Sequence, residues 1–441
     1  MSPVRSHIRW FLIFWMFVIS AVSFLDRVNW SIAVLPIEQT FHLTDIQFGW
    51  VFSAWALGYA LFQAPSGYLA DRIGPRKTLA FGTVWWAIFT GLTALVPSGL
   101  SGSLLLLMAV RFLLGAGEAV AYPASNRLVA SWIPAQERGL ANGFIFAGVG
   151  VGAGITPRLI TFVIVNYGWQ WAFWVSALIG LFAGMIWFFV SRDKPQEHPW
   201  IAPEEIAYIR AGLPPSTVAA TRQSFPWRGI FTNSSVIALT ASYFCYGYTA
   251  YIFFAWFFKY LSQVRGLNLK ASSYYAMLPF IAMAICSPLG GWISDIVAKR
   301  SGESAGRCGV ACGSMALAAV FVAMGTRAAD VRVASIVLAG GAGALYLSQS
   351  AFWSLSSRLG GRASGSLSGV MNTGNQIGGA ITASLTPLIA KYFGWGVSFF
   401  VAAGLCAVGA LLWLAVDPDQ QLFGTDGSPL ESFEMVSGGT Q

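Results

Sequence analysis

The feature that most constrains this chain is a series of twelve apolar runs, each about long enough to cross a membrane as a helix. About 20 apolar residues span the hydrocarbon core of a bilayer in this way. Hydrophobic residues make up 56% of the 441-residue chain and charged residues 10%, against roughly 25% charged in a soluble domain. The sequence therefore predicts an all-α integral membrane protein, rather than a secreted protein, a soluble enzyme or a nucleic-acid binder. The runs lie at residues 10–34, 47–70, 78–97, 103–125, 139–165, 170–190, 231–258, 271–294, 307–326, 332–352, 364–390 and 393–416.

A polar stretch divides these runs into two groups of six. We expect an N-terminal six-helix bundle at 1–190, a cytoplasmic central loop at 191–230 and a C-terminal six-helix bundle at 231–416. Within the central loop, a short helix is expected to begin after Pro203, because proline suits the first turn of a helix. The Gly- and Ser-rich remainder, 417–441, is expected to be a disordered cytoplasmic tail.

The lysines and arginines predict the orientation. In the first half they lie in the loops on the side of the N-terminus, and the opposite loops of that half carry none. By the positive-inside rule, both termini and the central loop are cytoplasmic, although the bias is weaker in the second half. The net charge of +8 therefore needs no nucleic-acid partner. We expect a monomeric, multi-pass protein of the plasma membrane, which in a bacterium is the inner membrane.

The two halves carry related sequences. Gly67-Tyr-Leu-Ala-Asp71 recurs as Gly291-Trp-Ile-Ser-Asp295, and each copy ends the second span of its half and precedes a basic loop. The second copy is degenerate, since it lacks the glycine and the full basic pattern that follow the first. Repeated units of this kind are typical of secondary transporters.

The segment from Gly67 to Lys77, GYLADRIGPRK, resembles the loop signature of the major facilitator superfamily between its second and third helices. Asp26-Arg27 in the first span, and Arg111 with Glu118 in the fourth, resemble the anion:cation symporter family of that superfamily. The resemblance covers residues 8–416. It implies twelve transmembrane helices in two six-helix pseudo-repeats and a proton-coupled importer of sugar acids or other organic anions.

Five charged residues lie well inside the apolar runs, and all are in the first half: Asp26, Arg27, Arg111, Glu118 and Arg158. Charges in hydrocarbon are costly and usually mark a functional site or a mutual pair. Arginine binds carboxylates through a planar fork and stays charged when buried, whereas a desolvated carboxylate can titrate near neutral pH. We therefore expect the arginines to bind an anion and the two acids to carry protons. The alternatives are structural ion pairs between the first and fourth spans and, for Arg158, a side chain that snorkels to the interface.

Helical geometry limits how these charges are arranged. Arg111 and Glu118 are nearly two turns apart and share a face, on which Gly115 would leave room for water or a ligand. Asp26 and Arg27 are adjacent and point about 100° apart, so at most one of them faces a central cavity squarely.

Uncharged polar residues in several spans are candidates for the rest of the site. Such groups hydrogen-bond hydroxyls, so they favour polyol recognition; the alternative is hydrogen bonding between helices. Tyr59 and Gln63, like Asn372 and Gln376, are four residues apart and share a helix face. The expected substrate-binding residues of this kind are Tyr59, Gln63, Ser350, Trp353, Asn372 and Gln376, and the same spans also carry Tyr243, Tyr246, Tyr248, Tyr251, Gln349 and Asn375.

The repeated glycine–aspartate loops are expected to act in gating. Gly67 permits two backbones to approach closely, and Asp71 can cap a neighbouring helix N-terminus or pair with Arg72. The resemblance implies that this latch holds the cytoplasmic side closed; the alternative is a topology anchor without a gating role. The expected gating residues are Gly67, Asp71, Arg72, Arg76 and Asp295.

The function predicted from these features is secondary active import of a small organic anion, a sugar acid or related carboxylate, with protons by alternating access. An exchanger or efflux transporter of the same fold, and a membrane sensor that does not transport, are the alternatives. No enzymatic activity, metal site or cofactor is expected, because the three histidines lie outside the spans and the five cysteines lie in or beside apolar runs. The motifs do not identify the anion.

Overall fold

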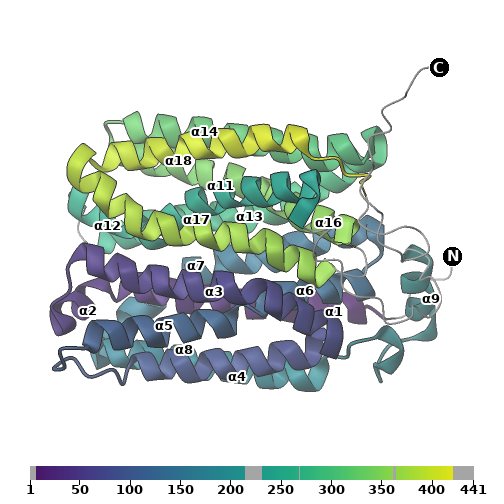
Figure 1. Ribbon diagram of the computed structural model, residues 1–441, viewed down its shortest axis with the longest axis horizontal. Helices are drawn as coiled ribbons and strands as arrows, with labels where there is room; N and C mark the ends of the chain where they lie inside the picture. The colour runs from purple at the N-terminus through teal and green to yellow at the C-terminus, as the bar shows by residue number, and fades with distance from the viewer. Residues whose placement is uncertain (1–5, 214–230, 268, 361–363, 421–441) are drawn as a thin grey trace, which may run out of the picture.

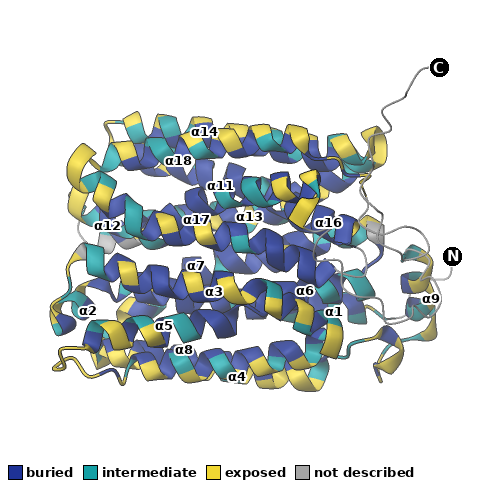
Figure 2. Ribbon diagram, in the orientation of Figure 1, coloured by how far each residue is buried: buried dark blue, intermediate teal, exposed yellow. Residues whose placement is uncertain are grey.

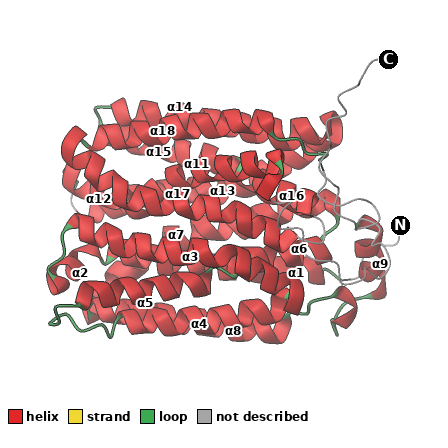
Figure 3. Cartoon of the chain, in the orientation of Figure 1, coloured by secondary structure: helices red, strands yellow, loops and turns green. Residues whose placement is uncertain are grey.

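The computed structural model describes residues 6–213, 231–267, 269–360 and 364–420, and this part of the chain is helical apart from turns and loops (Figure 3). The long helices lie side by side in one elongated bundle (Figure 1). Helix α9 (Pro203–Gly212) lies at one end of the bundle, and α2 (Val34–Phe41) and α12 (Phe257–Lys259) lie at the other. We call these the α9 end and the α2 end. Most of the predicted disordered tail, and residues 214–230 of the central loop, lie outside the described residues.

Each half of the described chain contributes six spans. The first half consists of α1 (Ile8–Ile32), α3 (Asp45–Ile73), α4 (Pro75–Thr93), α5 (Ser103–Glu118) continued by α6 (Ala121–Trp132), α7 (Arg138–Tyr167) and α8 (Trp169–Val190). The second half consists of α11 (Ser234–Ala255) continued by α12, α13 (Leu269–Glu303), α14 (Val310–Arg327), α15 (Val331–Leu347) continued by α16 (Gln349–Gly360), α17 (Ser364–Phe393) and α18 (Trp395–Leu412). The fourth span of each half is thus divided into two helices at a corresponding place.

The described helices have the length and surface expected for a membrane. Eight helical stretches are long and apolar enough to cross one, and the longest, Tyr274–Arg327, takes in both α13 and α14. Exposed side chains lie on the outward faces of the outer helices (Figure 2), and many are large and apolar, such as Val165 and Leu414, each 76% exposed. An apolar surface of this extent needs lipid to cover it. The predicted all-α membrane fold is confirmed.

Four glycines with positive φ show the internal repeat directly. Gly74, which follows α3, has φ +92°, and Gly302, near the end of α13, has φ +89°. Gly168 and Gly394, which precede α8 and α18, have φ +93° and +87°. Glycine is favoured at such positions because it lacks a Cβ. The expectation that the second loop copy lacks its glycine is therefore wrong. Gly302 follows Asp295 by seven residues, whereas Gly74 follows Asp71 by three, so the second copy is about one helical turn longer.

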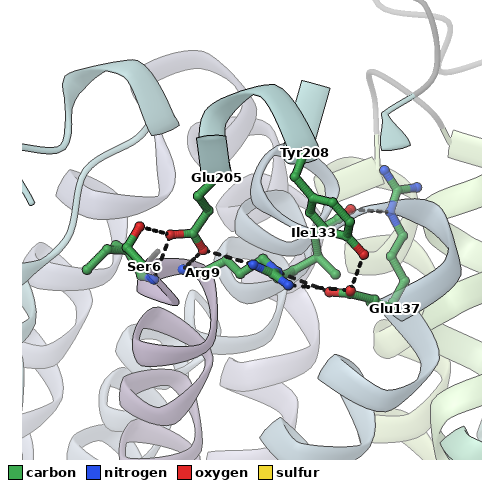
Figure 4. A network of polar contacts seen from close by, with 8 residues as sticks. Ser6, Arg9, Ile133, Glu137, Glu205 and Tyr208 are labelled. Atoms are coloured by element: carbon green, nitrogen blue, oxygen red, sulfur yellow. Dashed lines mark hydrogen bonds and ion pairs between the residues drawn. The ribbon is translucent and has the colours of Figure 1, made fainter. Parts of the chain in front are cut away.

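Helix α9 is fastened to the first half by the polar network in Figure 4. The fully buried carboxylate of Glu205 accepts hydrogen bonds from the backbone N–H groups of Ile8 (3.0 Å) and Arg9 (3.2 Å), so it caps the N-terminus of α1 from another helix. The Arg9 guanidinium pairs with Glu205 (3.0 Å) and with Glu137 (3.1 Å), which precedes α7. Glu137 also accepts the hydroxyl of Tyr208 (2.6 Å), and this bond holds the pKa of Tyr208 above its usual range. The described part of the central loop is thereby tied to the N-terminal half.

Candidate functional site

A small cavity lies between the two halves. Its charged wall comes from the first half and its uncharged polar wall from the second. The first half contributes Phe24, Arg27, Tyr122, Phe146 and Val149; the second contributes Tyr243, Tyr246, Ala250, Tyr251, Phe254, Tyr346, Gln349, Trp353, Asn372, Asn375 and Gln376.

Arg27 is the cation of this cavity. Its guanidinium carbon lies 4.3 Å from the ring centre of Phe24, 4.8 Å from that of Trp55 and 4.5 Å from that of Tyr59. Such cation–π contacts stabilise a desolvated arginine and fix the direction of its fork. One terminal nitrogen, Nη2, is buried and has no hydrogen-bond partner within the described part of the chain. The arrangement therefore leaves a charged donor available to a ligand.

Arg27 is shared between a carboxylate and the opposite half of the protein. Its Nε donates to Glu118 Oε2 at 3.1 Å, in an ion pair whose two side chains are at most 2% exposed. Its Nη1 donates to the Tyr251 hydroxyl at 3.3 Å, which in turn donates to Gln376 Oε1 at 2.7 Å. A chain of polar contacts thus runs from α5 through α1 to α11 and α17. A change at Glu118 or Arg27 can reach the contact between the halves through it.

Asp26 and Arg111 lie behind this layer. They are buried but do not line the cavity. Asp26 lies near Ser176 and Thr90, inside the first half, as the 100° offset from Arg27 allows. Arg111 packs against Trp30, with 4.8 Å between the guanidinium carbon and the ring centre, and it interacts electrostatically with Asp26 and Glu118. The structure therefore brings four of the five predicted charges into one cluster, in which Arg27 alone faces the cavity.

Gly115 leaves no room for a ligand, contrary to the expectation from its helix face. A Cβ at this position would lie 2.0 Å from the backbone oxygen of Trp55. The glycine instead lets α5 and α3 approach closely. This contact keeps Trp55, which packs on Arg27, close to the charged cluster.

The wall from the second half is built from aromatic residues and amides. Trp353 Nε1 and Gln349 Nε2 both donate to the Tyr243 hydroxyl at 2.8 Å. Asn375 Nδ2 donates to Asn372 Oδ1 at 3.2 Å. These bonds hold the amide groups in fixed orientations at the cavity surface. Of the uncharged residues predicted to bind substrate, Trp353, Asn372 and Gln376 line the cavity.

The other predicted substrate residues lie elsewhere. Tyr59 is fully buried under the Arg27 guanidinium, and Gln63 is fully buried on α3, where its backbone meets Gly369 of α17. Ser350 donates to the backbone oxygen of Ser287 at 3.2 Å, so it joins α16 to α13. Arg158 is exposed on α7. None of the four lines the cavity, because Gln63 and Ser350 serve contacts between helices and Arg158 points outward.

At the α9 end, two aspartates join the halves in a symmetrical way. Asp71, at the end of α3, accepts hydrogen bonds from the backbone N–H and the hydroxyl of Ser366, both at 3.0 Å, at the start of α17. Asp295, on α13, accepts from the backbone N–H of Leu140 at 3.0 Å, at the start of α7. Each carboxylate therefore caps a helix N-terminus of the other half, where the helix dipole favours a negative charge.

Close glycine contacts accompany these caps. A Cβ at Gly67 would lie 2.3 Å from the backbone oxygen of Gly365, and a Cβ at Gly291 would lie 2.4 Å from that of Gly139. The close backbone approach expected of Gly67 is therefore present, and it is repeated in the other copy. Two pairs of helices, α3 with α17 and α13 with α7, close this end of the cavity.

The ionic partner of Asp71 is not Arg72, which was one of its two predicted contacts, the other being a helix cap. Asp71 pairs with Arg127 of α6 at 3.4 Å, and Asp295 pairs with Arg307 at 2.7 Å. Arg72 is exposed. Arg76 lies in a contact within the first half, where its backbone N–H donates to Asp193 at 2.9 Å. The predicted pairing of Asp71 with Arg72 is thus replaced by a pair with α6, because Asp71 turns toward the interface between the halves.

The α2 end is also closed. Lys259 of α12 pairs with Glu38 of α2 at 3.4 Å, and both side chains are largely buried. Nearby, Trp256 Nε1 donates to the backbone oxygen of Ala383 at 3.2 Å, and the Ser53 hydroxyl donates to that of Ala380 at 2.8 Å. The Ser53 bond and the Lys259–Glu38 pair connect the two halves. In this conformation the two halves are therefore in contact at both ends of the bundle.

Several cavity residues were not predicted as substrate ligands. Tyr243, Tyr246 and Tyr251 come from the tyrosine-rich seventh span, and their spacing along α11 was the available signal. Gln349 and Asn375 neighbour residues that were predicted. Tyr122 is four residues from Glu118, and its position on the helix face of Arg111 and Glu118 was the available signal. Tyr346 carries no local signal that separates it from the other buried aromatics. No group of three or more His, Cys, Asp or Glu side chains that could hold a metal is present among the described residues.

Six spans in each of two related halves, with a polar cavity between them, define a secondary transporter within the part of the chain described here. The chain belongs to the Major Facilitator Superfamily, whose family model matches residues 16–383. The predicted membership of this superfamily and of its anion:cation symporter family is confirmed, as is the prediction that the chain is not an enzyme.

Two relatives are similar over nearly their whole length. The probable sulfoacetate transporter SauU of Cupriavidus necator is 33% identical over 399 residues, which are 90% of this chain and 91% of that protein. The D-galactonate transporter of Escherichia coli O6:H1 is 28% identical over 429 residues, 94% of this chain and 97% of that protein. The structure of the proton:xylose symporter XylE bound to 6-bromo-6-deoxy-D-glucose matches with a TM-score of 0.71 and 16% identity, over 91% of this chain and 94% of XylE. At that identity it supports the fold alone.

Proposed function

We propose that this protein imports a small organic anion, a sugar acid or related carboxylate, together with protons by alternating access. The observation that carries the proposal is the position of Arg27, which faces the cavity while its Nε is bonded to the buried carboxylate of Glu118. The names of the similar proteins, transporters of sulfoacetate and D-galactonate, support an anionic substrate.

Competition for Arg27 couples the proton to the anion. While Glu118 is ionised, it neutralises the guanidinium, and a substrate carboxylate at Nη2 would place two anions on one arginine. When Glu118 takes up a proton, the guanidinium charge becomes available to the substrate through its planar fork. Proton and anion therefore bind together, which is the condition for symport. The membrane potential contributes about 2.3 kcal/mol per charge for each 100 mV.

Asp26 is proposed as a second proton carrier that acts from behind the cavity. Both of its carboxyl oxygens are buried without a hydrogen-bond partner among the described residues, an arrangement that suits a neutral acid better than an ion. Arg111 interacts electrostatically with both Asp26 and Glu118. We propose that Arg111 supports the anion site through Glu118, without touching the substrate in this conformation.

The two ends of the bundle would open in turn. We assign the α9 end to the cytoplasm, from the positive-inside bias, and the protein to the plasma membrane as a monomer with both termini inside. The caps formed by Asp71 and Asp295 must then break for the inward-open state. The Lys259–Glu38 pair must break for the outward-open state. Since Asp71 and Asp295 cross between halves, we propose that they act as gates, with Gly67 and Gly291 allowing the close fit.

Transport by purified protein in liposomes tests this proposal. With an acidic exterior and no membrane potential, labelled aldonate should accumulate in the vesicles, and a protonophore should abolish the accumulation. Glu118→Gln should keep exchange of labelled for unlabelled anion but lose proton-driven accumulation. Exchange that is insensitive to the pH gradient in the unmodified protein would instead favour an exchanger.

A further inference from the structure

The cavity has one charged side and one neutral side. Among the described residues that line it, Arg27 is the only charged one. Two buried cations of the second half, Lys259 and Arg307, lie outside the cavity and pair with Glu38 and Asp295. A ligand whose carboxylate meets Arg27 therefore finds no second cation on the opposite wall.

That opposite wall presents hydrogen-bonding atoms that have no partner. They are Gln349 Oε1, Asn375 Oδ1, Asn372 Nδ2 and the Tyr246 hydroxyl, all buried and without a hydrogen bond in the described part of the chain. A buried polar atom without a partner destabilises the protein. Four of them belong to residues of one cavity wall, where a bound molecule would satisfy them.

The neighbouring bonds determine which end of each amide is free. Gln349 donates through its nitrogen to Tyr243, which leaves its oxygen without a hydrogen-bond partner in the described part of the chain. Asn375 donates through its nitrogen to the oxygen of Asn372. This bond leaves the oxygen of Asn375 and the nitrogen of Asn372 unpaired. The wall therefore offers two acceptors, one donor and one hydroxyl that can do either.

This set of atoms suits hydroxyl groups and opposes a second anion. A hydroxyl can donate to an amide oxygen and accept from an amide N–H. A second carboxylate has acceptors only, so it would face the oxygens of Gln349 and Asn375 without a cation to balance its charge, and burying such a charge unpaired is unfavourable.

We infer that the substrate is a monoanion, with one carboxylate on Arg27 and a hydroxylated chain against Gln349, Asn372, Asn375 and Tyr246, and that this wall excludes dianions. The inference rests on the proposed function, which by itself allows both kinds of acid. Gln349 and Asn375 are assigned as specificity-determining residues, because their free oxygens are the atoms that a second carboxylate would meet.

The test compares matched ligands on the purified full-length protein. Binding is measured by calorimetry and by thermal shift at pH 5.5 and 7.5. The probes are aldonates of the gluco, galacto and manno series, the corresponding six-carbon aldarates, and hexanoate. An aldarate differs from its aldonate by a carboxylate in place of the terminal hydroxymethyl group, and hexanoate lacks the hydroxyls. We expect the best aldonate to bind at least tenfold more tightly than its aldarate and than hexanoate.

Two variants test whether the residues of the second-half wall cause the preference for hydroxylated monoanions. Gln349→Met and Asn375→Leu should each weaken aldonate binding by about tenfold and leave hexanoate binding nearly unchanged. Asn142→Leu is the matched control, since Asn142 of α7 has a buried amide with an unpaired nitrogen but does not line the cavity. This variant should keep the ratio of aldonate affinity to hexanoate affinity of the unmodified protein. If a variant does not fold, the preference for aldonates over aldarates is still decided by the binding measurements on the unmodified protein.

The outcomes distinguish failure of this inference from failure of the proposed function, organic-anion import. Aldarates that bind as tightly as aldonates, or more tightly, overturn the inference and leave an organic-anion transporter. Equal binding of hexanoate and the aldonates overturns the role of the hydroxyls. If none of these acids binds at either pH, both the proposed function and the inference fail.

Discussion

The cap that Asp71 places on α17 provides a graded test of gating. Asp71→Asn keeps the size of the side chain and one carbonyl oxygen but removes the negative charge. The amide can still accept one bond from Ser366, whereas the ion pair with Arg127 and the attraction to the helix dipole are lost. The substitution should therefore weaken the closure of the α9 end without removing a core contact.

The structure allows an estimate of the size of this effect. A charge at a partly buried helix N-terminus contributes about 0.3–2 kcal/mol. The pair with Arg127, whose side chain is 32% exposed, adds about 0.2–1 kcal/mol after screening by solvent. A combined loss of about 1–2 kcal/mol shifts a two-state equilibrium by a factor of roughly 5–30. We expect a shift of this size toward the inward-open state.

Cysteine accessibility measures this shift. The five native cysteines are first replaced, and Ser368→Cys supplies one probe thiol. Ser368 is fully buried on α17, one helical turn from Asn372 of the cavity and on its α9 side. In inside-out vesicles, labelling of this thiol should become faster in the Asp71→Asn variant. A probe on the other side of the cavity, Ala380→Cys, should be labelled more slowly from outside.

A matched substitution separates gating from general loosening. Asp193 also accepts a backbone N–H, that of Arg76, but this bond lies within the first half. Asp193→Asn should therefore leave the labelling of both probes unchanged. Unchanged or slower labelling at Ser368→Cys in the Asp71→Asn variant would refute the gating role and leave Asp71 as a topology anchor.

Three further substitutions test other parts of the structure. Arg27→Lys should reduce uptake at least tenfold, because a point charge cannot serve Glu118, Tyr251 and the substrate at once; uptake close to normal would remove Arg27 as the anchor. Lys259→Met should speed labelling of Ala380→Cys from outside, since it removes the ion pair with Glu38, and unchanged labelling would argue against a gate at the α2 end. Glu205→Ala should lower the stability by about 3 kcal/mol, the lower part of the range for breaking a buried pair, as measured by thermal denaturation in detergent. The neighbouring Glu204→Ala is its control, and equal effects of the two would show that the cap on α1 contributes little.

Features that depend on local sequence could be predicted. The lengths of the spans, the close approach at Gly67 and the helix at Pro203 each follow from a short segment and its physical preferences. The 100° offset between Asp26 and Arg27 also implied that only one of them faces the cavity. Periodicity could not tell which, because the residues of both faces of α1 at this depth are buried.

Features that depend on the packing of distant helices could not be predicted. Ser350 and Gln63 cannot be distinguished from Trp353 and Asn372 by sequence pattern. All four side chains can form hydrogen bonds, and all lie on inner helices that are buried on nearly every face. Only the packing of the helices determines whether a buried face contacts another helix or lines the cavity. The choice of Arg127 over Arg72 as the partner of Asp71 likewise depends on how α6 and α17 meet α3.

The central claim is that a proton on Glu118 releases Arg27 for the anion, and the pH dependence of binding tests it most directly. The affinity of the purified protein for the best aldonate should rise as the pH falls from 8 to 5.5, with a slope of up to tenfold per pH unit if one proton is linked. In Glu118→Gln, whose side chain cannot ionise, the affinity should be high and should depend much less on pH than in the unmodified protein. A variant that keeps the pH dependence of the unmodified protein, or an unmodified protein whose affinity does not change with pH, would contradict the account.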